Sequence, residues 1–219
     1  MAVTSGKGEN KLQYKKKPFY SIIKRTFDFL VSLIFIITFS WLYIIVAIIV
    51  AVSDGAGKPF FVQERVGKNG KTFKLYKFRT MCVDAEAKKA ELMKFNEADG
   101  PAFKMKNDPR ITKVGKVLRA TNIDELPQML NILFGHMSFV GPRPPLPKEV
   151  EQYSDTDRLR LLVTPGLTCY WQASLNRNDI SFAQWMELDR KYIEDRSVWV
   201  DLKLIFKTIG VIIKHRDGR

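Results

Sequence analysis

One long apolar block near the start of the chain dominates the pattern of hydrophobic and polar positions. Phe29–Val52 contains 24 residues, none of them charged, proline or glycine. As one helix it would extend about 36 Å at roughly 1.5 Å per residue, against a hydrocarbon core of about 30 Å. A cleaved signal peptide would be shorter and end in small residues, and a buried soluble helix would carry regular polar positions. The block therefore predicts a membrane-inserted helix.

The charges around this block bear on whether the helix spans the membrane or dips into it and returns. Residues 1–25 hold seven basic residues and one acid, and the segment after the block also begins with several basic residues. By the positive-inside rule, both flanks favour the cytoplasmic side, which a re-entrant helix satisfies. Hydroxyls of Ser32, Thr38 and Ser40 could satisfy backbone groups freed at a bend. The charges favour re-entry only modestly, because long domains are translocated largely regardless of charge.

Beyond the block, the pattern predicts a small hairpin followed by helices. Phe60–Val66 and Thr72–Phe78 alternate about Asn69-Gly70, a strong hairpin signal. The last predicted helix is amphipathic, which fits a helix packed on the core, an interfacial helix with snorkelling lysines, or a homodimer contact. The predicted helices are Ala85–Glu97, Ile111–Arg119, Asp124–Phe134, Lys148–Val163, Ile180–Glu194 and Val198–Lys214.

We therefore expect an α+β fold that is mainly helical. Residues 1–17 are expected to form a basic flexible tail, and residues 18–53 a membrane-inserted, re-entrant helix. Residues 54–219 are expected to form one compact helical domain that contains the hairpin and amphipathic interfacial helices. The length of 219 residues is ample for one domain with a real core.

Composition narrows the chemistry. The 36 Lys and Arg residues against 23 Asp and Glu give a net charge of +13, which implies an anionic partner such as a nucleic acid, a lipid headgroup or a phosphorylated substrate. Two cysteines, Cys82 and Cys169, provide no disulfide framework and no common zinc site, which favours a reducing compartment. Two histidines cannot form a histidine metal site. Carboxylates, arginines and lysines are left as the candidate functional groups.

Two segments place such groups close together in the sequence. Lys77 and Arg79 stand where the second hairpin strand ends, although two cations there could simply be solvated. Asp124 and Glu125 fall in the first turn of a predicted helix capped by Thr121 or Asn122, where carboxylates often have only a capping role. Arg119 lies five residues before Asp124. A carboxylate kept ionised by a cation and a helix N-terminus can act as a nucleophile or bind Mg²⁺.

A third segment surrounds Arg143. Pro142 and Pro144 restrict the backbone on either side of this arginine, and Gly141 permits an unusual turn. An arginine fixed in this way loses less entropy when it binds a planar anion through two hydrogen bonds. The alternative is a rigid loop in which the arginine is incidental.

Taken together, these segments resemble the bacterial sugar transferase family, the monotopic polyprenyl-phosphate phosphoglycosyl transferases. The resemblance covers roughly residues 18–215, and the motifs are jointly far more specific than each is alone. They are Lys77–Met81, Arg119 with Asp124-Glu125, Ser138–Pro144, Thr164–Thr168 and Arg177-Asn178.

The resemblance implies an enzyme that transfers a sugar-1-phosphate from a UDP-sugar to undecaprenyl phosphate and releases UMP. Asp124 would be the nucleophile that forms a covalent phosphosugar intermediate. Glu125 would help hold Mg²⁺ beside it or assist the second half-reaction. Arg177 would lie near the uridine. The expected phosphate-binding residues are Lys77, Arg79, Arg119 and Arg143.

The resemblance also implies a place in the cell. The reaction would be the first membrane step of exopolysaccharide, capsule or other glycoconjugate synthesis. Because UDP-sugars are cytosolic, the catalytic domain, residues 54–219, would face the cytoplasm at the inner membrane. That requirement strengthens the re-entrant interpretation.

The sequence departs from the family pattern at two places. Members typically break the membrane helix with a Ser-Pro pair, whereas Ser40 is followed here by Trp41, so a straight or spanning helix stays an alternative. The stretch Cys169–Asn176 lacks glycines that members often show before the arginine equivalent to Arg177. The rival hypothesis from another class is a membrane-tethered basic protein that binds nucleic acid or anionic lipid. Because no nucleic-acid-binding motif supports it, we expect no nucleic-acid partner.

Overall fold

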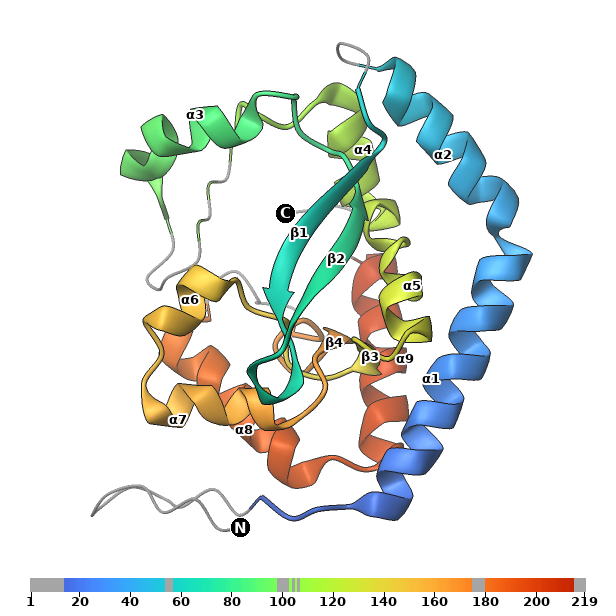
Figure 1. Ribbon diagram of the computed structural model, residues 1–219, viewed down its shortest axis with the longest axis vertical. Coiled ribbons are helices and arrows are strands. Elements are labelled where there is room, and N and C mark those ends of the chain that lie inside the picture. Colours follow the sequence, from blue (N-terminus) through green and yellow to red (C-terminus); the bar gives the residue numbers. More distant parts are fainter. Residues whose placement is uncertain are drawn as a thin grey trace.

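The structure is a computed structural model that describes residues 14–53, 57–97, 103, 105, 107–174 and 180–214. It is mainly helical with a small hairpin, as predicted (Figure 1). The α-helices are α1 (Pro18–Thr38), α2 (Ser40–Val52), α3 (Ala85–Leu92), α4 (Lys113–Ala120), α5 (Gln128–Leu133), α6 (Pro147–Glu151), α7 (Asp155–Arg158), α8 (Phe182–Asp195) and α9 (Val198–Lys214). The strands are β1 (Phe60–Val66), β2 (Thr72–Phe78), β3 (Ser138–Val140) and β4 (Gly166–Thr168), and short 3₁₀ turns include η3 (Ile123–Glu125) and η4 (Leu159–Leu162).

The apolar block does not form one straight helix. It is divided between α1 and α2, which meet at Phe39 with a bend of 64°. The bend forms although no proline lies at the break, so the straight helix that Ser40-Trp41 left as an alternative is not what the structure shows. The hydroxyl of Ser40 donates to the carbonyl of Ile37 (3.0 Å) and so satisfies a backbone group beside the break, as the sequence suggested for this serine. Among the described residues, no single helix is long and apolar enough to cross a membrane, whereas this bent pair meets the requirement of length and composition together.

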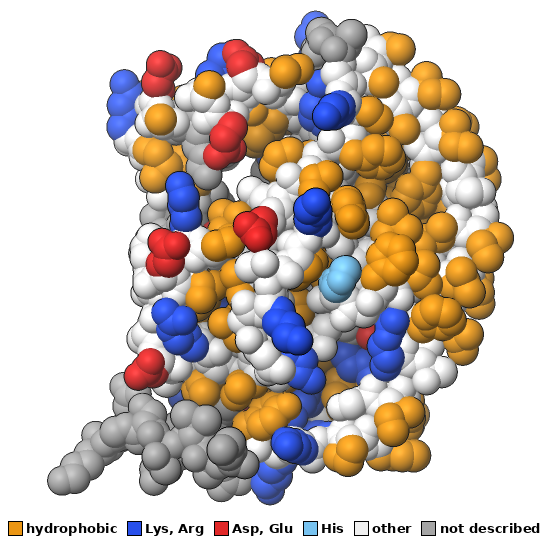
Figure 2. All heavy atoms as spheres, in the orientation of Figure 1, with side chains coloured by type: hydrophobic (Ala, Val, Ile, Leu, Met, Phe, Trp, Pro, Cys, Tyr) orange, Lys and Arg blue, Asp and Glu red, His pale blue; other side chains and the backbone are white. Residues whose placement is uncertain are grey.

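The helix pair forms an arc along one side of the molecule, and its outer face is covered by hydrophobic side chains (Figures 1 and 2). Trp41 is 57% exposed and Val52 is 76% exposed, values that a helix in a soluble core would not show. Such a contiguous exposed surface indicates contact with lipid or another protein. The other exposed apolar residues of the pair are Phe19, Ile22, Ile23, Phe27, Phe29, Leu30, Ile34, Ile37, Ile44, Ile45, Ile48 and Ile49.

The inner face of the arc packs against the hairpin, α4 and α5. Val46 and Val50 of α2 belong to a buried cluster with Phe78 of β2 and Leu118 of α4. Farther along the arc, α1 packs against the short helix α5. There Arg25 donates to the carbonyls of Ile132 (2.8 Å) and Leu133 (2.7 Å), which caps the C-terminus of α5. The inner face of both helices therefore packs against the rest of the domain.

The predicted hairpin is confirmed, with both strands at the predicted bounds. The strands β1 and β2 are antiparallel, with Phe60 opposite Phe78 and Val66 opposite Thr72. Asn69 (φ 58°) and Gly70 (φ 77°) adopt the left-handed conformation that an Asn-Gly turn requires. Lys77 lies near the end of β2, opposite Phe61 of β1.

Three helix predictions were wrong in their boundaries. The predicted helix Ala85–Glu97 is shorter, because α3 ends at Leu92 and a 3₁₀ turn follows at Met93–Phe95. The predicted helix Lys148–Val163 is divided into α6, α7 and η4, because Ser154 begins a new helix through a capping box with Asp157. The predicted helix Asp124–Phe134 is likewise divided, because Pro127 separates η3 from α5. By contrast, α9 has the predicted bounds.

The parallel pair of β3 and β4 was not predicted from the sequence. Ser138 lies opposite Gly166, and Val140 lies opposite Thr168. The pair is packed against α9, and Val140 forms a buried cluster with Tyr192 and Leu204. The proline-rich segment begins directly after β3, at Gly141.

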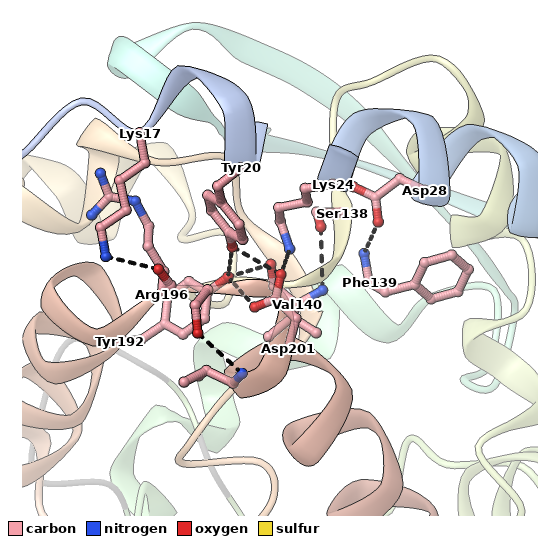
Figure 3. A network of polar contacts seen from close by, with 12 residues as sticks. Lys17, Tyr20, Lys24, Asp28, Ser138, Phe139, Val140, Tyr192, Arg196 and Asp201 are labelled. Atoms are coloured by element: carbon pink, nitrogen blue, oxygen red, sulfur yellow. Dashed lines mark hydrogen bonds and ion pairs between the residues drawn. The ribbon is translucent and has the colours of Figure 1, made fainter. Parts of the chain in front are cut away.

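A network of polar contacts ties the start of α1 to α8, α9 and β3 (Figure 3). Asp201 of α9 accepts hydrogen bonds from Tyr20 (2.8 Å) and Tyr192 (2.9 Å). It also forms an ion pair with Lys24 (2.6 Å). Asp28, which is only 3% exposed, accepts a hydrogen bond from the backbone N–H of Phe139 in β3 (3.1 Å). The basic residues before the apolar block thus partly serve internal contacts, which charge counting did not predict.

Candidate active site

A polar pocket lies where the hairpin, η3, the proline-rich loop and β4 meet. It is lined by three cations, Arg65, Lys77 and Arg143, against one carboxylate, Glu125. This excess of positive charge suits an anionic ligand with more than one negative charge. The remaining lining residues are Leu75, Gln128, Pro144, Gly166, Leu167 and Gln172.

The carboxylate pair lies in η3 rather than at the start of an α-helix. Glu125 Oε1 is 2.7 Å from Lys77 Nζ, and the two side chains are 13% and 18% exposed. Asp124 is buried, with 6% exposure, and is not among the residues that line the pocket. The structure therefore brings Lys77 and Glu125 together at the pocket, with Asp124 next to it in the chain.

The capping role predicted for Thr121 or Asn122 was wrong. The Thr121 hydroxyl donates to the carbonyls of Val117 (2.9 Å) and Leu118 (3.1 Å) of the preceding helix α4. Asn122 is left-handed (φ 55°) and makes no side-chain cap. A turn of three residues has only a small dipole. The nearby cations, and not the turn, therefore provide most of the electrostatic stabilisation of the carboxylates.

The proline-rich loop is held by hydrogen bonds to four consecutive carbonyl groups. The carbonyl of Pro142 accepts from Gly166 N (2.9 Å), and that of Arg143 accepts from the Arg160 guanidinium (2.9 Å). The carbonyl of Pro144 accepts from the Arg65 guanidinium (3.0 Å), and that of Pro145 accepts from Val66 N (2.9 Å). Restricted by prolines and held at each carbonyl, the loop presents Arg143 to the pocket from a fixed backbone.

Gly141 serves close packing and not an unusual turn, so that part of the prediction was wrong. The glycines described with positive φ are Gly70 and Gly135. A Cβ atom on Gly141 would lie 2.4 Å from the carbonyl oxygen of Thr164. A Cβ atom on Gly166 would lie 2.0 Å from the backbone nitrogen of Gly141. The backbones of β3 and β4 therefore meet where no side chain fits.

Arg160, which holds the carbonyl of Arg143, is itself deeply buried. Its guanidinium forms an ion pair with Asp189 of α8 (2.7 Å), and the two side chains are 2% and 1% exposed. The guanidinium also lies over the ring of Trp185, 4.9 Å from the ring centroid, and donates to the hydroxyl of Tyr153 (2.7 Å). A buried cation of this kind needs its carboxylate partner.

Other predicted site residues do not line this pocket. Arg79 donates to the carbonyl of Val50 at the end of α2 (3.0 Å). Arg119 donates through Nε to the hydroxyl of Thr80 (2.9 Å), beside the end of β2. Arg177 lies outside the described residues. The structure thus places Arg79 and Arg119 around the end of β2, with Lys77 extending from the same strand into the pocket.

Sequence reasoning missed Arg65, Gln128 and Gln172, which line the pocket. Gln128 and Gln172 are 3% and 8% exposed, although glutamine is usually a surface residue. Arg65 occupies a polar position in an alternating strand, and such positions usually face solvent. Its inward orientation depends on contacts with the proline-rich loop, which lies 79 residues away in the sequence.

The described residues contain no group of three or more His, Cys, Asp or Glu side chains that could hold a metal ion by themselves. Asp124 and Glu125 offer two neighbouring carboxylates. Mg²⁺ commonly binds through one or two carboxylates, with substrate phosphates and water completing its shell. The donor set therefore fits a Mg²⁺ ion shared with a phosphorylated substrate.

The apolar arc and the cationic pocket define a class of protein, one that handles an anionic ligand beside an apolar surface. Comparison with known proteins identifies the family: the chain belongs to the bacterial sugar transferases, whose family profile matches residues 19–215.

Three relatives illustrate this membership. The galactosyl transferase CpsE of Streptococcus agalactiae serotype III is 48% identical over 160 residues, covering 73% of this chain and 35% of that protein. The exopolysaccharide production protein ExoY of Sinorhizobium fredii is 42% identical over 206 residues, covering 92% and 90%. The undecaprenyl-phosphate galactose phosphotransferase of Salmonella typhimurium is 40% identical over 201 residues, covering 90% and 41%. The chain thus spans less than half of the first and third relatives and most of the second.

Proposed function

We propose that the protein is a phosphoglycosyl transferase that moves a sugar-1-phosphate from a UDP-sugar to undecaprenyl phosphate and releases UMP. Family membership and the name of the Salmonella relative support the acceptor and the type of reaction. Other relatives are named for N-acetylgalactosamine and for glucose, so the donor sugar is left open. The name of ExoY supports a role in exopolysaccharide synthesis.

The observation that carries this proposal is the pocket, in which Arg65, Lys77 and Arg143 converge beside the Asp124-Glu125 pair. Phosphoryl transfer is catalysed mainly by positioning and by neutralising the charge of the transferred group. Two phosphorylated substrates bring several negative charges together, and this cationic pocket offsets them. Transfer through a covalent intermediate also requires a nucleophile, and the carboxylate of Asp124 next to the pocket can provide it.

In the first half-reaction, a carboxylate oxygen of Asp124 attacks the β-phosphorus of the UDP-sugar. The bond between that phosphorus and the bridging oxygen breaks, and UMP leaves with the bridging oxygen and its electron pair. The sugar phosphate is then joined to Asp124 as an acyl phosphate. Arg143 and Lys77 hold the phosphate oxygens while negative charge develops on the leaving group.

In the second half-reaction, a phosphate oxygen of undecaprenyl phosphate attacks the same phosphorus. The bond to Asp124 breaks, the carboxylate is restored, and the product is the undecaprenyl diphosphate sugar. No proton is needed from an acid, because the leaving carboxylate is a weak base. Asp124 and Glu125 would hold Mg²⁺, which supplies further charge neutralisation at the diphosphate when bound.

The membrane arrangement proposed for α1 and α2 is re-entrant. The start of α1 is tied to α9 through Lys24 and Asp201, and the end of α2 is tied to β2 through Val50 and Arg79. Both ends of the arc thus contact the same domain, which a simple span across the bilayer would separate. The outer apolar face would enter one leaflet of the inner membrane, with the catalytic domain in the cytoplasm.

The test is UMP release from a panel of UDP-sugars by detergent-solubilised protein with Mg²⁺, with and without undecaprenyl phosphate. We expect multiple turnovers with at least one donor, only when the lipid phosphate is present. Asp124→Asn should reduce the rate by at least about a thousandfold, since a covalent route is then closed. Full turnover by a folded Asp124→Asn protein would refute the nucleophile, and silence across the panel would refute the proposed activity.

A further inference from the structure

Arg65 is a buried cation that lacks a charged partner. The residue is 8% exposed, and none of the ion pairs among the described residues includes it. The carboxylates Glu125 and Glu149 act on it electrostatically but make no ion pair with it. Glu149 instead accepts the backbone N–H of Leu146 (2.8 Å). A buried arginine of this kind is costly to fold unless an anion compensates its charge.

The guanidinium of Arg65 is fixed in place. Its two terminal nitrogens donate to the carbonyl of Pro144 (3.0 Å) and to Oε1 of Gln63 (2.6 Å). Its Nε atom is buried and has no hydrogen-bond partner within the part of the chain that the structure describes. A prepared donor therefore remains on a side chain that lines the pocket.

The surroundings of Arg65 disfavour its charged form when no ligand is bound. Burial, with Arg143 as a second cause, lowers the pKa of Arg65 to about 10. Two arginines in one pocket repel each other, whereas the carboxylate there, Glu125, is engaged by Lys77. An anion between the two guanidinium groups would remove the repulsion and accept a hydrogen bond from Nε of Arg65.

We propose that Arg65 is a phosphate-binding residue that acts together with Arg143 on the oxygens of a substrate phosphate. This inference rests on the proposed function and adds to it a residue that none of the recognised motifs includes. The phosphate belongs either to the diphosphate of the UDP-sugar or to the lipid acceptor, and the two sources can be separated by experiment.

The first experiment measures binding without turnover. Inorganic pyrophosphate is added to the full-length protein in detergent without Mg²⁺, and the rise in thermal midpoint is compared with that in sulfate of equal ionic strength. The variants are Arg65→Gln, Arg65→Lys and the control Arg190→Gln, a partly exposed arginine of α8 outside the pocket. We expect stabilisation of the wild-type and control proteins, little for Arg65→Gln, and an intermediate effect for Arg65→Lys.

The second experiment assigns the phosphate. The KM of Arg65→Gln should rise about ten- to a hundredfold for one substrate, as expected for a lost charge-assisted hydrogen bond. A rise for the UDP-sugar assigns Arg65 to the diphosphate, and a rise for undecaprenyl phosphate assigns it to the lipid. If Arg65→Gln does not fold, the same pyrophosphate and KM comparisons are made with Arg65→Lys, and their result tests the proposal.

The proposal would be overturned if a folded Arg65→Gln protein were stabilised by pyrophosphate as much as the wild type and kept its KM for both substrates. It would also be overturned by a wild-type protein that pyrophosphate does not stabilise more than sulfate. Failure of the proposed reaction itself is distinguishable, because it would abolish turnover and leave the pyrophosphate comparison intact.

Discussion

Arg143 reaches the pocket from a loop whose position depends on a residue outside it. Its carbonyl accepts a hydrogen bond from Arg160, and Arg160 is buried against Asp189. Removing one partner of such a pair leaves an uncompensated charge in the interior. The geometry of a proposed phosphate-binding residue thus depends on an ion pair between η4 and α8.

We predict that Asp189→Asn lowers the free energy of unfolding by about 3–5 kcal/mol, because the Arg160 charge loses its partner. The double variant Arg160→Met with Asp189→Leu should be markedly more stable than Asp189→Asn, since neither charge remains. Urea unfolding of the detergent-solubilised proteins measures both effects. A double variant no more stable than the single one would show that the ion pair is not the cause.

At the scale of elements, the close approach of β3 and β4 controls the start of the proline-rich loop. We predict that Gly166→Ala destabilises the protein by about 1–3 kcal/mol or more, because its Cβ would meet the backbone of Gly141 and force the strands apart. The UMP-release rate of Gly166→Ala should also fall, because Arg143 lies two residues after Gly141 and would be displaced with it.

Gly210→Ala in α9 is the matched control for this substitution. A Cβ atom there would meet nothing within 4 Å, so the change should stabilise the helix by about 0.5–1 kcal/mol. Thermal unfolding of both variants decides the matter. Equal effects at the two glycines would contradict the argument from strand contact.

The elements differed in how far their sequences could predict them. The hairpin and α9 have the predicted bounds, because alternation about Asn69-Gly70 and a sustained helical period are local signals. The strands β3 and β4 contain three residues each and pair across a long interval, so no local period marks them. A bend in the apolar block was predicted, but its position at Phe39 was not, since no proline marks it and the hydroxyl of Ser40 is a weaker signal.

The site showed the same division. The motifs that predicted Lys77, Glu125 and Arg143 identified residues that the fold brings into one pocket. Arg65 could not be predicted, because an isolated arginine in an alternating strand usually faces solvent. Its burial follows from tertiary contacts with the proline-rich loop.

At the scale of the whole molecule, the account requires both ends of the helix pair to lie on one side of the membrane. We predict that, in a Cys82→Ser background, cysteines introduced at Ser5 and at Lys71 in the hairpin turn have the same accessibility. Buried Cys169 should not react. In intact spheroplasts neither introduced cysteine should react with an impermeant maleimide, and both should react after permeabilisation.

Labelling of only one of the two introduced cysteines from outside intact spheroplasts, whichever it is, would indicate a spanning helix and contradict the re-entrant arrangement. A Thr72→Cys variant, next to the turn, provides a check that the result does not depend on one position. The labelling needs no assumption about catalytic activity.

The most direct test of the central claim is transfer of the sugar phosphate onto the protein itself. The protein is mixed with the UDP-sugar that gives turnover, radiolabelled in the sugar, with Mg²⁺ and without undecaprenyl phosphate, and the labelled protein is counted after rapid quenching. The account predicts label on the wild-type protein, none on Asp124→Asn, and release of the label when undecaprenyl phosphate is added. An active wild-type protein that never acquires label, or label that persists on Asp124→Asn, would contradict it.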